Sequence, residues 1–360
     1  PDPDPTPDPD PTPDPDPTPD PDPTPPTTTA DVNNRAELDA AIQAGGTYTV
    51  AGGDYGDLDV RSDGVTLVAH DPADRPKLTR LKIKDRQTVV IDGFHLKYDY
   101  QAGDHETSNR ILLQNSSQCV IRNCFIEGDV DANTGSPHGR GVNVTDCDDV
   151  VIESNVVRTF WKCFAFNRGN RNIFRGNDVG GFRSDGLTIS QVTGMLIENN
   201  YMHDRKTLPG SGDHGDMIQI QRSSPGGVNG LTIRNNFIDI NNGTLCQSIH
   251  AGYDKYGADP HVGLVIQGNE IINAQANGIN LDNAPGAIVH DNVLTPVDVN
   301  APGVEIPKIH AKGASPDVVN NTAGSVQING AAAPNNTVAL LDASTRRSIA
   351  RTRWGQFNFN

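Results

Sequence analysis

The chain has 360 residues and a formal net charge of −16, which disfavours a general attraction to nucleic acids or to anionic membrane surfaces. No run of apolar residues approaches the ~18 that a membrane-spanning helix needs, so we expect no membrane insertion. The five cysteines follow no metal-binding spacing, and we expect buried free thiols that pack as small hydrophobic groups.

Residues 1–29 open with a repeat of Pro-Asp-Pro-Asp-Pro-Thr. The eight aspartates of residues 1–26, which contain no Lys or Arg, account for half of the net charge of −16. Alternating proline and like charges favour an extended, self-repelling chain that cannot form a core. We therefore predict a spacer over residues 1–29, of a kind typical of secreted or surface proteins.

Residues 31–44 carry apolar residues on one helical face and predict a short helix. Asp31 or Thr29 is placed to cap its start, and Gly45 follows its last turn. We expect this helix to cover the open end of the domain that follows.

An apolar–polar phrase with an asparagine at a fixed place recurs through the middle of the chain. The separations between successive asparagines are 22, 23, 36, 33 and 23 residues. A period of this size indicates a solenoid, in which each coil buries its core only against its neighbours. Inward-facing asparagines can then bond along the stack. The asparagines are Asn155, Asn177, Asn200, Asn236, Asn269 and Asn292, and Cys124 and Phe94 hold the same place in two earlier copies.

This repeat resembles the right-handed parallel β-helix of the pectate-lyase-like superfamily over roughly residues 30–320. The resemblance implies an all-β solenoid with a short N-terminal capping helix. It leaves the chemistry open, because the superfamily includes lyases, hydrolases, epimerases and non-catalytic phage spikes. We expect residues 321–360 to add strands that cap the solenoid or form a small β module.

A second strand precedes each asparagine phrase, and its middle residue is expected to point outward. Inserted loops before this strand (98–109, 129–139 and 204–215) and after it (222–230 and 253–262) predict walls on both sides of a groove. The outward column is Asn143, Ala165, Thr188, Gln219, His250 and Asn280.

A charged column is expected at one corner of the coils, where neighbouring strands lie ~4.8 Å apart. Two cations precede two carboxylates, Asp185 and Asp216. Close carboxylates raise a pKa or recruit a cation, so the readings are a Ca²⁺ site at these two aspartates, an acid–base pair, or a structural charge ladder. The column is Arg140, Lys162, Asp185, Asp216, Gln247 and Asn277.

Several side chains beside this column are suited to proton transfer or substrate binding. His214 begins a groove strand beside the aspartates, and a histidine there is a candidate acid or base near neutral pH. Basic residues near a groove in an acidic protein favour a carboxylated or sulfated substrate. The catalytic candidates are His214, His250, Lys162, Arg183 and Tyr253, and the substrate-binding candidates are Gln219, Asn143, Arg168, Arg222, Lys255 and Tyr256.

These features favour a secreted or surface lyase that cleaves an acidic, uronate-containing polysaccharide by β-elimination. The alternatives are a glycan-binding tailspike or adhesin, and a uronan C5-epimerase or glycoside hydrolase. We expect no organic cofactor and either a monomer or a homotrimer.

Overall fold

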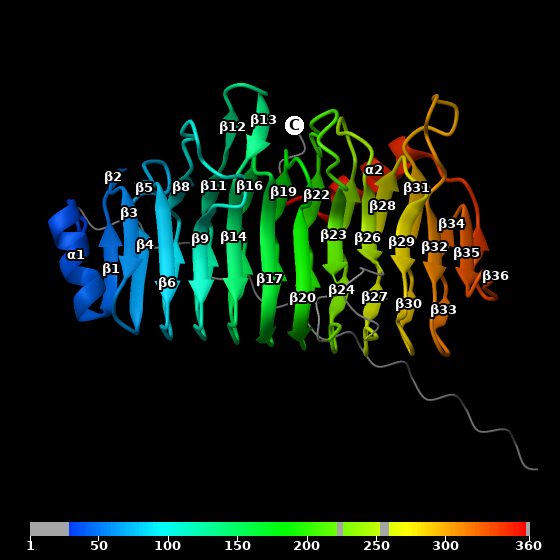
Figure 1. Cartoon of the computed structure of the whole chain (residues 1–360), viewed down its shortest axis with the longest axis horizontal. Helices are drawn as coiled ribbons and strands as arrows, with labels where there is room; N and C mark the ends of the chain where they lie inside the picture. Colours follow the sequence, from blue (N-terminus) through cyan, green and yellow to red (C-terminus); the bar gives the residue numbers. More distant parts are fainter. Residues whose placement is uncertain (1–28, 222–225, 253–258, 358–360) are drawn as a thin grey trace, which may run out of the picture.

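The computed structural model describes residues 29–221, 226–252 and 259–357. Its strands form three long sheets, and the chain visits each sheet once per coil (Figure 1). Successive coils pair in parallel throughout the solenoid. The predicted all-β solenoid is thus confirmed, while the predicted spacer lies almost entirely outside the described residues.

The first sheet contains the strand of each asparagine phrase. In its three-residue strands the middle side chain points inward and the two flanking side chains point outward. The inward side chains, such as Ile152 and Ile197, are fully buried. The strands are β1 (Gly46–Val50), β4 (Val65–Ala69), β7 (Val90–Asp92), β10 (Val120–Arg122), β15 (Val151–Glu153), β18 (Ile173–Arg175), β21 (Leu196–Glu198), β24 (Thr232–Arg234), β27 (Val265–Gln267), β30 (Ile288–His290) and β33 (Asp317–Val319).

The second sheet follows directly after the asparagine of each phrase. Its strands are equally short and again bury their middle residue, such as Val157. They are β2 (Gly53–Asp54), β5 (Pro76–Leu78), β8 (His95–Lys97), β11 (Phe125–Glu127), β16 (Val156–Arg158), β19 (Asp178–Gly180), β22 (Tyr201–His203), β25 (Phe237–Asp239), β28 (Glu270–Asn273), β31 (Val293–Pro296), β34 (Thr322–Ala323) and β37 (Thr337–Val338).

The third sheet has the longest strands and faces the viewer in Figure 1. An antiparallel hairpin of β12 (Asp129–Asp131) and β13 (Ser136–His138) rises beside it. Its strands are β3 (Asp57–Val60), β6 (Arg80–Lys84), β9 (Asn109–Gln114), β14 (Arg140–Thr145), β17 (Lys162–Asn170), β20 (Leu187–Thr193), β23 (Asp216–Gln221), β26 (Gln247–Ala251), β29 (Asn277–Leu281), β32 (Lys308–Ala311), β35 (Ser325–Ile328) and β36 (Ala331–Ala332).

The asparagines of the phrase form a continuous buried ladder inside the coils, as predicted. Asn177 Nδ2 donates to Asn200 Oδ1 at 3.1 Å, and Asn200 Nδ2 donates to Asn236 Oδ1 at 2.9 Å. The ladder starts at the backbone N–H of Cys124, which donates to Asn155 Oδ1. It continues past the predicted range through Asn321 to Asn336.

Helix α1 (Arg35–Ala44) lies at the N-terminal end of the solenoid (Figure 1). Leu38 and Ile42 are buried against the first coils. Its N-cap is Asn34, whose Oδ1 accepts a hydrogen bond from Glu37 N at 3.1 Å. The predicted caps, Asp31 and Thr29, were wrong, because Asp31 instead bonds Thr49 in β1.

The C-terminal segment contains a helix where the sequence pattern predicts only short strands. Helix α2 (Ala343–Arg353) lies against the second sheet near β28 and β31. Its arginines pair with buried carboxylates: Arg347 Nε lies 2.7 Å from Asp239 Oδ2, and Arg346 pairs with Glu270. Trp354 stacks on Phe237. The helix therefore covers part of the outer face of the second sheet.

The five cysteines are free and buried. Burial raises the pKa of the Cys124 thiol to about 12. These thiols therefore act as small core groups, which confirms the prediction.

The asparagine ladder predicts a large loss of stability on substitution. Replacing Asn200 with Ala removes bonds to Asn177, Asn236 and the carbonyl of Phe174, leaving buried donors and acceptors unpaired at about 1–3 kcal/mol each. We expect the free energy of unfolding in urea to fall by roughly 3 kcal/mol or more. The control is Asn300→Ala, at an exposed loop asparagine. An equal effect of both substitutions would contradict a stabilising role for the ladder.

Candidate active site

The outer face of the third sheet carries the outward column in the predicted register. Asn143 pairs with Ala165, Ala165 with Thr188, and Thr188 with Gln219. Gln219 in turn pairs with His250. Because side chains alternate across a strand, all five belong to the face that the inserted loops border.

A cavity of about 250 Å³ lies on this face where the floor is lowest. Part of its lining comes from Thr145, Asn167, Ser190 and Gln221, each two residues after a member of the outward column. Loop 98–108, the β12–β13 hairpin and loop 204–215 precede strands of the third sheet and form one wall. The opposite wall, predicted at 222–230 and 253–262, is only partly described. The lining residues are Arg140, Asn143, Thr145, Lys162, Ala165, Phe166, Asn167, Thr188, Ser190 and Gln221.

The predicted charged column is also present at the corner where the third sheet begins. Arg140 pairs in register with Lys162, and Lys162 Nζ contacts the carboxylate of Asp185. Asp216 N donates to Asp185 Oδ1 at 3.2 Å, which joins the next coil. Asp185 is fully buried, and Thr188 Oγ1 also donates to it. Lys162 therefore offsets one buried carboxylate at the edge of the cavity.

Asp216 is the second buried carboxylate, and neither of its oxygens has a hydrogen-bond partner among the described residues. Burial raises its pKa, and the charge of Asp185 adds to the effect. His214 Nδ1 lies 3.7 Å from Asp216 Oδ2. The proximity of the Asp216 carboxylate raises the pKa of His214. The His214 side chain is 71% exposed, so it can reach a ligand that Asp216 cannot.

Trp161 and Arg183 tie the wall to this corner. Trp161 Nε1 donates to Asp213 Oδ1 at 3.1 Å, and the Arg140 guanidinium lies 5.4 Å from the centre of the indole ring. Arg183 Nη2 lies 2.6 Å from Glu106 Oε2, and Arg183 Nε lies 2.8 Å from Asp213 Oδ2. Arg183 is buried. It therefore bridges two wall loops, and its side chain does not line the cavity.

The remaining predicted residues fall into four groups. The ring of His250 lies 6.4 Å from the ring of His214, and Asn280 Nδ2 is 3.1 Å from its Nδ1. Gln219 and Asn143 face the groove. Arg168 pairs with Asp146 at the far end of β17, away from the charged corner. Arg222, Tyr253, Lys255 and Tyr256 lie outside the described residues.

Comparison with known proteins identifies the solenoid. Residues 83–256 match the family described as "Right handed beta helix region". The chain folds as a right-handed parallel β-helix. No curated protein shows significant similarity to the sequence.

Solved structures share the β-helix at low sequence identity. A double mutant of the tailspike protein of E. coli bacteriophage HK620 is 16% identical with a TM-score of 0.51, over 82% of this chain and 63% of that one. DFA-IIIase from Arthrobacter chlorophenolicus A6 is 12% identical with a TM-score of 0.49, over 86% and 91%. Alginate lyase from Paenibacillus sp. str. FPU-7 is 15% identical with a TM-score of 0.45, over 87% and 98%. At these identities the likeness shows the fold alone.

The donor set at Asp185 and Asp216 does not fit the predicted calcium ion. Ca²⁺ takes six to eight oxygen ligands, whereas here one of only two carboxylates is held by the Lys162 ammonium. Among the described parts of the β-helix, no group of three or more His, Cys, Asp or Glu is arranged to hold a metal.

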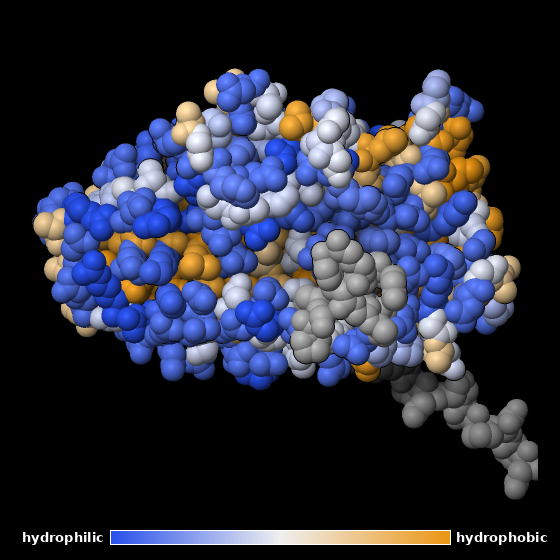
Figure 2. Space-filling view, viewed as in Figure 1, coloured by the Kyte–Doolittle hydropathy of each residue, from blue (hydrophilic) through white to orange (hydrophobic). Residues whose placement is uncertain are grey.

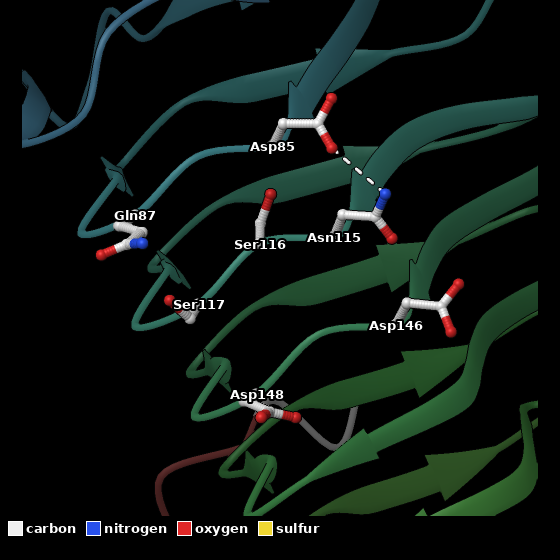
Figure 3. Close-up of a pocket in the computed structure, with 7 residues that line it drawn as sticks. All are labelled: Asp85, Gln87, Asn115, Ser116, Ser117, Asp146 and Asp148. Carbon is white, nitrogen blue, oxygen red and sulfur yellow. Dashed lines mark hydrogen bonds between the residues drawn. The ribbon is translucent and has the colours of Figure 1, made fainter.

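A second polar hollow, of about 450 Å³, lies at the turns that leave the third sheet (Figure 3). Asp85, Asn115 and Asp146 occupy equivalent positive-φ positions on successive turns. Asn115 Nδ2 donates to Asp85 Oδ1 at 3.1 Å, and Asp148 Oδ1 accepts from Asn170. The acidic groups here bond the neighbouring turns, so the hollow is a by-product of turn stacking.

The structure adds Arg140 and Trp161 to the candidate site. The sequence pattern predicts Arg140 in the charged column but assigns it no role. Trp161 directly precedes Lys162 and is one of two tryptophans in the chain, which was the available signal. No sequence signal indicates the pairing of Glu106 with Arg183, because 77 residues separate them.

The Lys162–Asp185 pair predicts strong coupling between its two side chains. Lys162→Met leaves Asp185 as a buried charge without its cation, at a cost of about 3–5 kcal/mol. We expect the double variant Lys162→Met/Asp185→Asn to be clearly more stable than the sum of the two single effects, measured by urea unfolding. Additive losses would show that the pair is not coupled.

Asp216 predicts a pH-dependent stability difference. Its folded-state pKa is raised, so the stability it contributes is present below its unfolded pKa and is lost as the pH rises through the folded value. Asp216→Asn should therefore unfold at a higher temperature than the wild type at pH 7, and the gap should shrink as the pH falls toward about 4. A gap that is constant with pH would contradict the raised pKa.

Proposed function

We propose that this β-helix is a polysaccharide lyase that cleaves an acidic, uronate-containing chain in the groove on the third sheet. The observation that carries the proposal is the charged corner: Lys162 and Arg140 line the cavity, and His214 is linked to Lys162 through the buried Asp185 and Asp216. The floor beside them carries amides and hydroxyls, which suit sugar hydroxyl groups.

The cations would act on the substrate carboxylate. Removing the proton at C5 of a uronate is difficult while the adjacent carboxylate keeps its negative charge. Lys162 and Arg140 neutralise that charge when the carboxylate lies at the upper edge of the cavity, and they stabilise the developing enolate in the same position. Asp185 holds the Lys162 ammonium in place for this role.

His214 would carry the proton. In its neutral form, the imidazole takes the proton from C5. The C4–O4 bond breaks as the C4–C5 double bond forms, and the resulting imidazolium donates the proton to O4 of the leaving chain. Asp216 is buried and therefore cannot contact the substrate. It acts through His214, because its carboxylate raises the pKa of that histidine. Each turnover thus returns His214 to its neutral state.

Location and assembly remain predictions. A polymeric substrate is consistent with a secreted or surface protein. The described residues contain no helix long and apolar enough to cross a membrane. Whether the β-helix is a monomer or a homotrimer is a separate prediction that sedimentation can test.

The lyase proposal predicts an unsaturated product absorbing near ~235 nm when purified protein is incubated with alginate or polygalacturonate. His214→Ala should lower kcat/KM by about 10²–10⁴-fold, with little change in melting temperature because the side chain is mostly exposed. The control is His290→Ala, at a histidine on the first sheet that pairs with Asp317.

The pH profile tests the role of Asp216 separately. Activity should rise with pH as His214 loses its proton, and Asp216→Asn should move this acidic limb to lower pH, because the charge that raises the pKa of His214 is gone. Binding of the polymer without any product would favour a glycan-binding protein. A change of uronate configuration without chain cleavage would favour an epimerase.

A further inference from the structure

The cations of the β-helix are mostly paired along the stack. On a turn, Arg171 Nη2 lies 2.7 Å from Asp149, and on the first sheet Arg175 Nη2 lies 2.7 Å from Glu153, each one coil back. On the third sheet, Arg80 lies 3.1 Å from Asp57 in the same way. The regular pairing makes an unpaired cation on the groove face informative.

Two partly buried cations on the groove face have no carboxylate partner among the described residues. Lys84, at the end of β6, has neither a hydrogen bond nor an ion pair there, although its side chain is partly buried. Arg140 faces the ring of Trp161, and its Nε is buried without a hydrogen-bond partner. A partly buried cation without a counter-charge has lost hydration that an anionic ligand can replace.

Register places Lys84 on the floor of the same groove. Lys84 pairs with Gln114 in β9, and Gln114 pairs with Thr145, which lines the cavity. Leu112, partly exposed between Lys82 and Asn143, lies in the adjacent outward column. Figure 2 shows apolar groups between hydrophilic ones over the N-terminal coils, where the outward side chains of β6 are charged. The outer face that carries the cavity therefore extends to Lys84 toward the N-terminal end.

The groove face differs in the opposite direction. The outward column there continues through His250, Asn280 and His310. Lys312 follows His310 by two residues, just after β32, and its Nζ lies 2.7 Å from Asp282 Oδ1. Lys308, in β32, has no ion pair among the described residues either, but its side chain is exposed. The partly buried cations without a counter-charge on the described groove face, Lys84 and Arg140, thus lie on the N-terminal side of His214.

We propose that Lys84 forms an anion subsite, separate from the reacting position at Lys162 and Arg140, that binds the carboxylate of a sugar unit on the N-terminal side of the reaction. The ligand class rests on the proposed function. Lys84 is five coils from the strand of Asp216, or about 24 Å along the axis. Leu112, on the strand between those of Lys84 and Arg140, offers an apolar surface for the face of a sugar ring. A substrate must therefore extend over several units in this direction to use the subsite.

The experiment measures binding in a protein that cannot react. His214→Ala protein is titrated calorimetrically with alginate oligosaccharides of graded length, and then again with Lys84→Gln added. We expect Lys84→Gln to weaken binding of long oligosaccharides about fivefold and to leave short ones unchanged. The matched control is Lys77→Gln, an exposed lysine of β5 on the second sheet.

The outcomes separate this inference from the lyase proposal. Length-dependent weakening by Lys84→Gln supports the subsite even if the wild-type protein releases no unsaturated product. Equal effects of Lys84→Gln and Lys77→Gln, or an equal effect on short and long chains, overturn it even if the protein is a lyase. Failure of all acidic oligosaccharides to bind overturns the subsite as well. A melting curve of Lys84→Gln that matches the parent excludes misfolding as the cause.

Discussion

The fixed distance between coils is the constraint on which the whole molecule depends. Backbone hydrogen bonding holds each strand ~4.8 Å from its equivalent in the next coil, so every residue meets the side chain at the same position one repeat away. An uncharged amide profits from this arrangement, because each asparagine both donates and accepts along the ladder. A charge does not, since a like charge would lie within a few ångströms. At the last position of the first-sheet strands, carboxylates and arginines therefore alternate from coil to coil, as in Glu153, Arg175, Glu198 and Arg234.

The candidate site is an exception to that alternation. Asp185 and Asp216 are consecutive in the column, and both are fully buried. Lys162 offsets the charge of the first, while the second has only an exposed histidine at 3.7 Å. Such an arrangement costs stability and persists where it tunes a neighbouring group. The raised pKa of His214 is the measurable result.

The columns were predictable from the sequence because a solenoid converts sequence period into spatial position. Once the asparagines fix the coil length, the register of Asn143, Thr188 and His250 follows by counting, and the strand pairings agree. Counting cannot give what depends on inserted loops or on the direction of a side chain. The burial of Arg183 between Glu106 and Asp213 is of the first kind. The complete burial of Asp216, which removes it from contact with a polymer, is of the second kind.

Helix α2 changes how such a structure comes apart. A linear array of coils frays from its ends, because a terminal coil contacts only one neighbour. Here Arg347 and Arg346 tie residues that follow the last strand back to Asp239 and Glu270, 108 and 76 positions earlier in the chain. Peeling away the final strands must therefore also break buried ion pairs and the stacking of Trp354 on Phe237. The C-terminal coils therefore unfold cooperatively with the middle of the β-helix, and the C-terminal end is protected from fraying.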